Sequence, residues 1–295
     1  MKRANLLFTL ILLLASSLAS HAQVGIGTSS PNAALDVTST TQGFLPPRMT
    51  TTQRDAISSP AVGLVIFNTT TNCLNFYGGL WIEACGSGGY PAGAVFCASG
   101  VTTVVDVTNP TTGKTWMDRN LGASQVAASS TDANSYGDLY QWGRRSDGHQ
   151  CRTSATTSTL SSVDQPTNGN FILAPNTPFD WRDPQNTNLW QGVNGVNNPC
   201  PSGYRIPTDA ELDAERATWS PNNNSAGAFA SLLKLPLAGF RSGFFGSLSS
   251  VGTGGFYWSS KVSGNASLVL NFYSASAFMD ASVRAYGFSV RCLKD

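Results

Sequence analysis

Charged side chains are scarce in this chain of 295 residues. They make up 12% of the sequence, and the 18 Lys and Arg residues nearly balance the 17 Asp and Glu residues. Proteins that bind nucleic acid or an anionic membrane through charge carry a basic excess, which is missing here. We therefore expect no nucleic-acid partner. Gly, Ser, Thr and Asn take the place of the missing charge, a composition typical of β-rich chains with many loops.

Histidine and closely spaced cysteines are scarcer still. Of the two histidines, His21 lies near the amino terminus and His149 follows Asp147 by two residues. A Ser-His-Asp triad built on them lacks the nucleophile elbow, so we expect His149 to be a hydrogen-bonded structural residue. With no C-x-x-C pair and so few imidazoles, we also expect no zinc site. The sequence therefore predicts no enzyme and no cofactor.

Carboxylates also give little support to catalysis. Paired acids for glycoside hydrolysis require that the fold gathers residues such as Asp138 and Asp147. The acids at 209, 211 and 213 have a simpler explanation, since they sit in the first turns of a predicted helix.

Long apolar runs are absent after the first residues. Lys2 and Arg3 precede an apolar stretch over residues 6–14, and the small residues at 20–22 form a cleavage site. The run is too short for a bilayer span, and no later stretch is long enough. We expect residues 1–22 to be a signal peptide, Gln23 to begin the mature chain, and the protein to be secreted or displayed at the cell surface.

The six cysteines all lie after the predicted signal peptide, in a part of the chain that meets an oxidising compartment. Cys73 and Cys85 flank a hairpin whose turn is Gly78-Gly79, so we pair them. Of the other four, we pair Cys200 with Cys292.

Residues 23–86 form short apolar runs separated by Gly, Pro and Thr, which predicts a β-rich module with one helical turn at 51–57. "GIGTSSPNAALDV", "GFLPPRMTTTQRDAI" and "VGLVIFNTTTNCLNFYGGLW" resemble modules of tail-fibre-type and surface proteins of Bacteroidetes and their phages. Such modules are spacers, often trimeric. The resemblance implies a spacer that forms a homotrimer, and a plain small β-domain stays open as the alternative.

A glycine-rich linker at residues 87–93 leads to a second predicted domain, residues 94–295. Trp142, Trp181 and Trp190 are spaced through its long polar stretch and are expected to fix loops to a core. In "NPCPSGYRIPTDAELDAERATW", Thr208 and Glu211 form a capping box, so we predict a helix over 209–219. A second helix is predicted over 226–235, ended by Pro236.

Strands follow, in which Leu268, Leu270 and Phe272 alternate with Val269, Asn271 and Tyr273. We expect each such strand to bury one face.

Six blocks of this domain carry a resemblance. "WMDRNLGA", "YGDLYQWGRRSDGHQ", "CPSGYRIPTDAEL", "LKLPLAGFR", "FYWSS" and "GFSVRC" closely match the major paralogous domain named after Fibrobacter succinogenes, over residues 94–295. That domain is similar to the C-type lectin-like fold of formylglycine-generating enzymes. The implied fold class is α+β: a small twisted antiparallel sheet, two helices and long loops.

Two departures from related proteins bear on function. Formylglycine-generating enzymes use two nearby cysteines in their C-terminal half, but only Cys292 lies beyond Cys200 here. The Glu-Pro-Asn and Trp-Asn-Asp tripeptides by which many C-type lectins hold calcium and sugar are also absent. Neither activity is therefore expected from the resemblance.

The stretch 240–290 alternates framework blocks with a restricted set of residue types. This layout is similar to the variable proteins of diversity-generating retroelements, in which adenines of a template copy are randomised. Changing the first two bases of AAC gives Tyr, Phe, Ser, Ala, Val or Asp, never Trp, Met or Lys. The positions that fit, and that we predict to bind ligand, are Phe240, Ser242, Phe244, Phe245, Phe256, Val269, Tyr273, Ala275, Ser276, Phe278, Asp280, Ala281, Ser282, Val283 and Tyr286.

The residue chemistry agrees with a contact surface. Tyr and Phe give large rigid contact area at low entropic cost, while Ser and Ala let a partner approach. Phe272 and Phe288 are expected in the core instead, because they lie in register with Leu or Val. We predict a display protein that binds a protein, glycan or phage ligand through a diversified surface. The alternative is a carbohydrate-binding or adhesive module without diversification.

Overall fold

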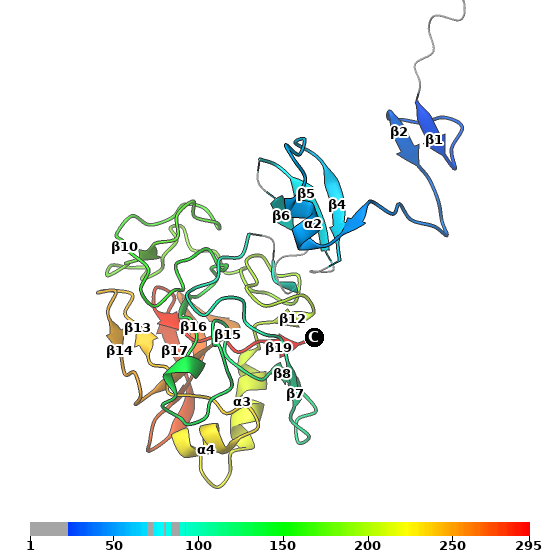
Figure 1. Cartoon of the computed structure of the whole chain (residues 1–295). Helices are drawn as coiled ribbons and strands as arrows, with labels where there is room; N and C mark the ends of the chain where they lie inside the picture. Colours follow the sequence, from blue (N-terminus) through cyan, green and yellow to red (C-terminus); the bar gives the residue numbers. More distant parts are fainter. Residues whose placement is uncertain (1–22, 70–72, 80, 84–88, 92) are drawn as a thin grey trace, which may run out of the picture. The chain divides into compact units, whose positions relative to one another are not determined.

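The computed structural model describes residues 23–295 except 70–72, 80, 84–88 and 92 (Figure 1). The chain divides into two compact units, with the boundary between Arg48 and Met49. It is mostly β-structure with few helices, which fits the predicted α+β class. None of the helices in the described ranges is long and apolar enough to cross a membrane.

The first unit contains a two-stranded parallel sheet. Strands β1 (Val24–Ile26) and β2 (Leu35–Val37) pair with Val24 opposite Leu35 and Ile26 opposite Val37. Since paired and alternate residues share a face, these four aliphatic side chains lie on one side of the sheet. Val24 and Leu35 are each 52% exposed, Ile26 is 56% exposed and Val37 is 39% exposed. An isolated pair of strands with such a face is at best marginally stable in water.

A four-stranded sheet in the order β3-β4-β5-β6 comes next, and all of it except Arg48 belongs to the second unit. Its strands are β3 (Arg48–Met49), β4 (Val65–Asn68), β5 (Cys73–Tyr77) and β6 (Trp81–Glu83). The predicted helical turn is confirmed as α2 (Thr51–Asp55), which starts with a capping box between Thr50 and Gln53. The predicted hairpin joins β5 and β6. Of the predicted Cys73–Cys85 pair, Cys85 lies outside the described residues.

The rest of the second unit holds two four-stranded sheets of short strands. One has the order β12-β19-β8-β7, and the other the order β14-β13-β18-β9. Their bounds are β7 (Asp106–Thr108), β8 (Thr115–Met117), β9 (Tyr140–Gln141), β12 (Tyr204–Arg205), β13 (Phe240–Arg241), β14 (Leu248–Ser249), β18 (Gly287–Phe288) and β19 (Leu293–Lys294). A parallel pair, β10 (Thr156–Thr157) and β11 (Phe171–Ile172), and a 3-10 turn, η2 (Ala133–Ser135), lie in the long loops.

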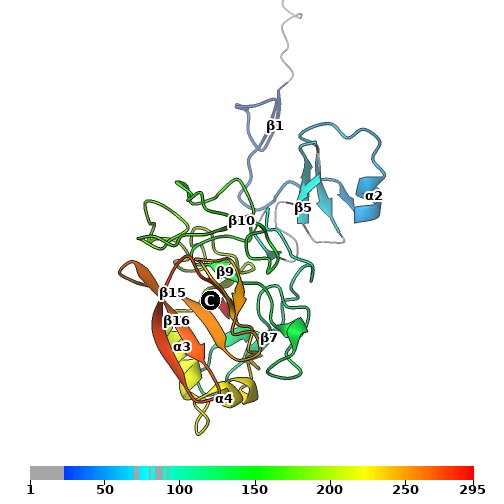
Figure 2. The same ribbon diagram turned by 90° about the vertical axis from the view of Figure 1, so that its left-hand side faces the viewer.

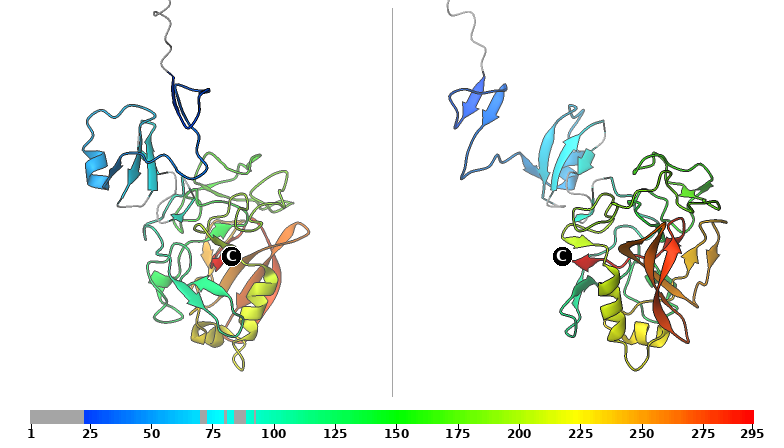
Figure 3. Two further views of the ribbon diagram at one scale, coloured as in Figure 1. Left: turned by 90° about the vertical axis from the view of Figure 1, so that its right-hand side faces the viewer. Right: turned by 180° about the vertical axis from the view of Figure 1, so that it is seen from behind.

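The longest strands form a three-stranded antiparallel sheet of β15 (Gly255–Ser263), β16 (Ala266–Phe272) and β17 (Ala277–Val283). Helix α3 (Asp209–Ala217) lies along one face of this sheet (Figures 2 and 3). On that face Leu270 and Phe272 pack with Leu212 and Trp219.

The opposite face of β16 is buried as well. Val269 is 1% exposed and packs with Trp142 and Trp258 in a second cluster. The prediction of one buried face per strand is therefore wrong for β16. The reason is that Trp142, Trp181 and Trp190 from the long loops belong to the same cluster as Val269 and cover the side that the alternation had assigned to solvent.

The helices begin where the sequence predicts and end earlier. The capping box of Thr208 and Glu211 is confirmed, and α3 ends at Ala217. Helix α4 (Ser225–Ala230) stops before Ser231, whose backbone is extended. The predicted helix over 226–235 is thus wrong in its second half. Leaving the helix lets Leu233 and Leu235, each 1% exposed, reach the core.

Two disulfides and three tryptophans hold the long loops. The predicted pair Cys200–Cys292 is confirmed, and Cys97 bonds to Cys151. Each of the tryptophans predicted to fix loops is at most 1% exposed and donates its indole N–H to a backbone carbonyl: Trp142 to Ser259, Trp181 to Trp142, and Trp190 to Asn197. That prediction is confirmed.

Candidate functional site

A pocket of about 260 Å³ opens beside the three-stranded sheet. Eight of the predicted ligand-binding residues line it. Six come from strands β13, β15, β16 and β17, one directly follows β16, and one directly precedes β18. They are Phe240, Phe256, Val269, Tyr273, Asp280, Ala281, Ser282 and Tyr286, and they are joined there by Asn271 and Phe288. Positions spread over almost fifty residues of sequence thus come together in one cavity.

Strand pairing explains how β16 and β17 contribute. Val269 lies opposite Asp280, and Ser267 opposite Ser282, across the antiparallel ladder. Cross-strand partners project from the same face of a sheet, so Asp280 and Ser282 stand beside Val269 on the pocket side. Asn271 belongs to the same face because it is two residues from Val269.

Five aromatic rings form the wall. Phe240 meets Phe256 edge to face at 5.0 Å between ring centroids, and Phe256 meets Tyr273 in the same way at 5.6 Å. Tyr286 and Phe288 are stacked, with centroids 5.8 Å apart. Such contacts fix the rings against one another, so the wall is preformed.

Besides Ser282 and the tyrosine hydroxyls, the lining contains an amide and a carboxylate, those of Asn271 and Asp280. Asn271 is 7% exposed, and its Oδ1 has no hydrogen-bond partner within the described part of the chain. Asp280 is exposed, and its carboxylate accepts the backbone N–H of Ala281 at 2.8 Å. Burial, followed by the charge of Asp280, raises the pKa of Tyr273, which keeps the phenol neutral.

Asn271 was missed by the sequence prediction. Its signal was present, because it is a polar residue between Leu270 and Phe272 on a strand that is buried on both faces. The prediction of one solvent-facing side concealed it.

The other predicted positions lie outside the pocket. Phe244 borders it, with its ring 5.3 Å from that of Tyr286. Phe245 is 80% exposed and Phe278 41% exposed. Ser242 is buried, and its hydroxyl accepts the backbone N–H groups of Phe244 and Phe245. Ala275 and Ser276 are exposed in the turn after β16, and Val283 is half-buried at the end of β17.

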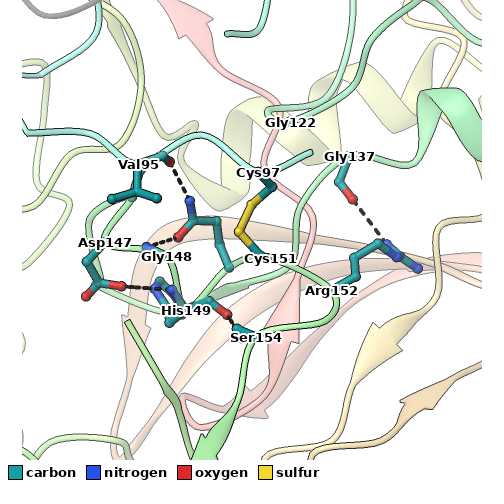
Figure 4. Close-up of a disulfide and its surroundings, with 12 residues drawn as sticks. Val95, Cys97, Gly122, Gly137, Asp147, Gly148, His149, Cys151, Arg152 and Ser154 are labelled. Atoms are coloured by element: carbon teal, nitrogen blue, oxygen red, sulfur yellow. Dashed lines mark hydrogen bonds and ion pairs between the residues drawn. A yellow bond between two sulfur atoms is a disulfide. The ribbon is translucent and has the colours of Figure 1, made fainter. Parts of the chain in front are cut away.

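His149 lies in a buried network next to the Cys97–Cys151 disulfide (Figure 4). Its Nε2 accepts the backbone N–H of Gln141 at 3.0 Å, so its Nδ1 carries the proton and donates to Asp147 Oδ1 at 2.6 Å. Burial, together with the nearby charge of Arg144, lowers the pKa of His149 to about 4. The predicted hydrogen bonding of His149 is confirmed, and the side chain is fully buried.

The remaining acids are not gathered into one site. Glu211 pairs with Arg205 and closes the capping box, and Asp213 pairs with Arg216. Within the described ranges no group of three His, Cys, Asp or Glu side chains is arranged to hold a metal ion.

Comparison with known families concerns the amino-terminal part. Residues 25–103 match the model of a family described as phage tail like trimerisation region. This match fits the predicted tail-fibre-like module and covers about a quarter of the chain. No curated protein and no solved structure matches the chain.

Proposed function

We propose that this protein is an exported display protein that binds its ligand non-covalently in the pocket beside β16. Its amino-terminal module joins copies of the chain into a homotrimer, and its carboxy-terminal domain presents one pocket per copy. Linking several sites in this way raises the avidity for a multivalent target without any new contact. The ligand is a protein, a glycan or a phage component.

One observation carries this proposal: eight of the fifteen positions predicted from sequence layout and residue type line a single preformed pocket. The rings of Phe240, Phe256, Tyr273 and Tyr286 converge there although they are distant in sequence. A preformed apolar pocket with a few polar groups is the usual form of a small binding site.

We further propose that the carboxy-terminal domain is a C-type lectin-like domain of the Fibrobacter type. In this proposal it acts as the variable protein of a diversity-generating retroelement. Two disulfides, long loops, and a three-stranded antiparallel sheet with a helix on one face support it. The disulfides also suit a protein that works outside the cell.

A carbohydrate-binding module without diversification is the second candidate. The aromatic wall favours it, because the flat faces of Phe and Tyr suit the apolar faces of sugars as well as protein side chains.

Binding is tested with the chain from Gln23 onward on protein and glycan arrays, followed by titration of any hit. We expect Tyr286→Ser to weaken binding at least about tenfold, because central aromatic anchors dominate such contacts. Leu232→Ser is the control, since Leu232 is exposed and outside the pocket. Equal binding by both variants and the original chain would refute the pocket as the site.

Diversification is tested on the gene. The predicted positions must have codons that end in C or T, and a nearby near-copy of the 3′ end must carry Asn codons there, beside a reverse transcriptase gene. If the template is missing, the module without diversification is the better description.

A further inference from the structure

We infer that the pocket takes a cation, namely the ammonium or guanidinium group of a lysine or arginine side chain on a protein partner. This inference names the ligand class for the proposed binding function and rests on it.

The ring wall supplies the first reason. The negative faces of aromatic rings attract a cation, and several rings around one cavity form a cage for an ammonium group. The pocket has five rings, and its volume of about 260 Å³ is below the roughly 300–1,000 Å³ of sites that enclose whole small ligands. Such a pocket suits one inserted side chain, whose apolar stem contacts the rings.

The charge balance supplies the second reason. Asp280 places a carboxylate in the lining, and none of the lining residues is Lys, Arg or His. The ion pairs among the described residues leave Asp280 without a cationic partner. The pocket therefore presents negative charge that an incoming cation would balance.

The orphaned amide supplies the third reason. The Oδ1 atom of Asn271 is a buried acceptor with no donor, and leaving such an atom unpaired is costly. An ammonium or guanidinium group brings several N–H donors and no acceptor. A cation that reaches Asn271 donates a hydrogen bond to this atom. The carboxylate of Asp280, on the next strand, then compensates for the water that the cation loses on entering the pocket.

The test compares two small probes that share a stem. Nα-acetyl-lysine methylamide and Nα-acetyl-norleucine methylamide are titrated against the chain from Gln23 onward, and NMR shifts of the Tyr273 and Tyr286 ring resonances report occupancy. We expect the lysine probe to bind at least about fivefold more tightly than the norleucine probe. Asp280→Asn should reduce that ratio to under about twofold, while Asp183→Asn, an exposed acid outside the pocket, should leave it unchanged.

Asn271→Leu gives a second measurement. Removing the unpaired acceptor should leave the melting temperature of the protein equal or higher, and it should weaken binding of the lysine probe. A variant that binds the lysine probe as well as the original chain would contradict the role of Asn271.

The outcomes separate the inference from the proposed function. If norleucine or methyl glucoside shifts the pocket resonances and the lysine probe does not, the cation is wrong and ligand binding stands. The same holds if an array hit binds the pocket equally well with Asp280→Asn. If neither a probe nor any array ligand perturbs the pocket, both proposals fail together.

Discussion

At the scale of the residue, the predicted ligand-binding positions differ in how much a substitution is expected to lower the free energy of unfolding. Val269 is 1% exposed within the core cluster that contains Trp142 and Trp258, whereas Phe245 is 80% exposed. Both fit the set of residue types that randomised Asn codons produce, and Asp belongs to that set. A diversified surface needs positions that accept every member of the set, so burial divides the positions into permissive and restrictive ones.

Val269→Asp and Phe245→Asp test this division. A carboxylate at position 269 is buried without a partner, so we expect the free energy of unfolding to fall by about 3 kcal/mol or more. At position 245 the change should stay within about 0.5 kcal/mol. Chemical denaturation followed by tryptophan fluorescence measures both. Similar losses at the two positions would show that exposure does not determine tolerance here.

At the scale of the element, local sequence signals predicted where helices and turns begin better than where helices end or which strand faces are buried. The helical turn α2, the capping box before α3 and the turn at Gly78-Gly79 depend on residues close together in sequence, and all three were predicted. The end of α4 and the second buried face of β16 depend on residues far away in sequence. Leu233 leaves the helix because the core accepts it, and nothing near it in sequence reveals that.

The same contrast holds for the pocket. Residue type and layout singled out Tyr273 and Tyr286, which the fold brings to one cavity, but the pairing of Val269 with Asp280 comes from the register of β16 and β17. Register between strands is set by the whole sheet and its cover, so it was beyond the sequence patterns.

Helix α3 provides the prediction at this scale. Thr208→Ala removes the hydroxyl that accepts the Glu211 backbone N–H, and we expect a loss of about 1 kcal/mol in unfolding free energy. Thr208→Ser keeps the hydroxyl and serves as the control. Thermal unfolding by circular dichroism measures both. If alanine and serine behaved alike, the cap would not contribute to stability.

At the scale of the whole molecule, the exposed aliphatic face of the β1–β2 sheet is expected to be buried against another surface, because two isolated strands are marginally stable in water. This aliphatic face, formed by Val24, Ile26, Leu35 and Val37, belongs to the region that matches the trimerisation family. We propose that the homotrimer would bury this face against the same face of other copies, which would remove apolar surface from water.

Ile26→Asp tests that arrangement. A charge in the covered face should reduce the mass of the chain from Gln23 onward from three copies to one, measured by light scattering after size exclusion. Asp36→Ser, on the opposite face, should leave the trimer intact. A trimer that survives Ile26→Asp would place the contact elsewhere in the module.

The two described disulfides have a consequence for proteolysis. Cys97 bonds to Cys151 and Cys200 to Cys292, so the first bridge ends at residue 151 before the second begins at residue 200. A cut between residues 151 and 200 would therefore cross neither of them. The pieces would then be held only by contacts such as the Trp142 indole donating to Ser259. The two pieces would separate on a non-reducing denaturing gel. The segment between residues 151 and 200 is therefore a suitable split site for a two-fragment complementation assay.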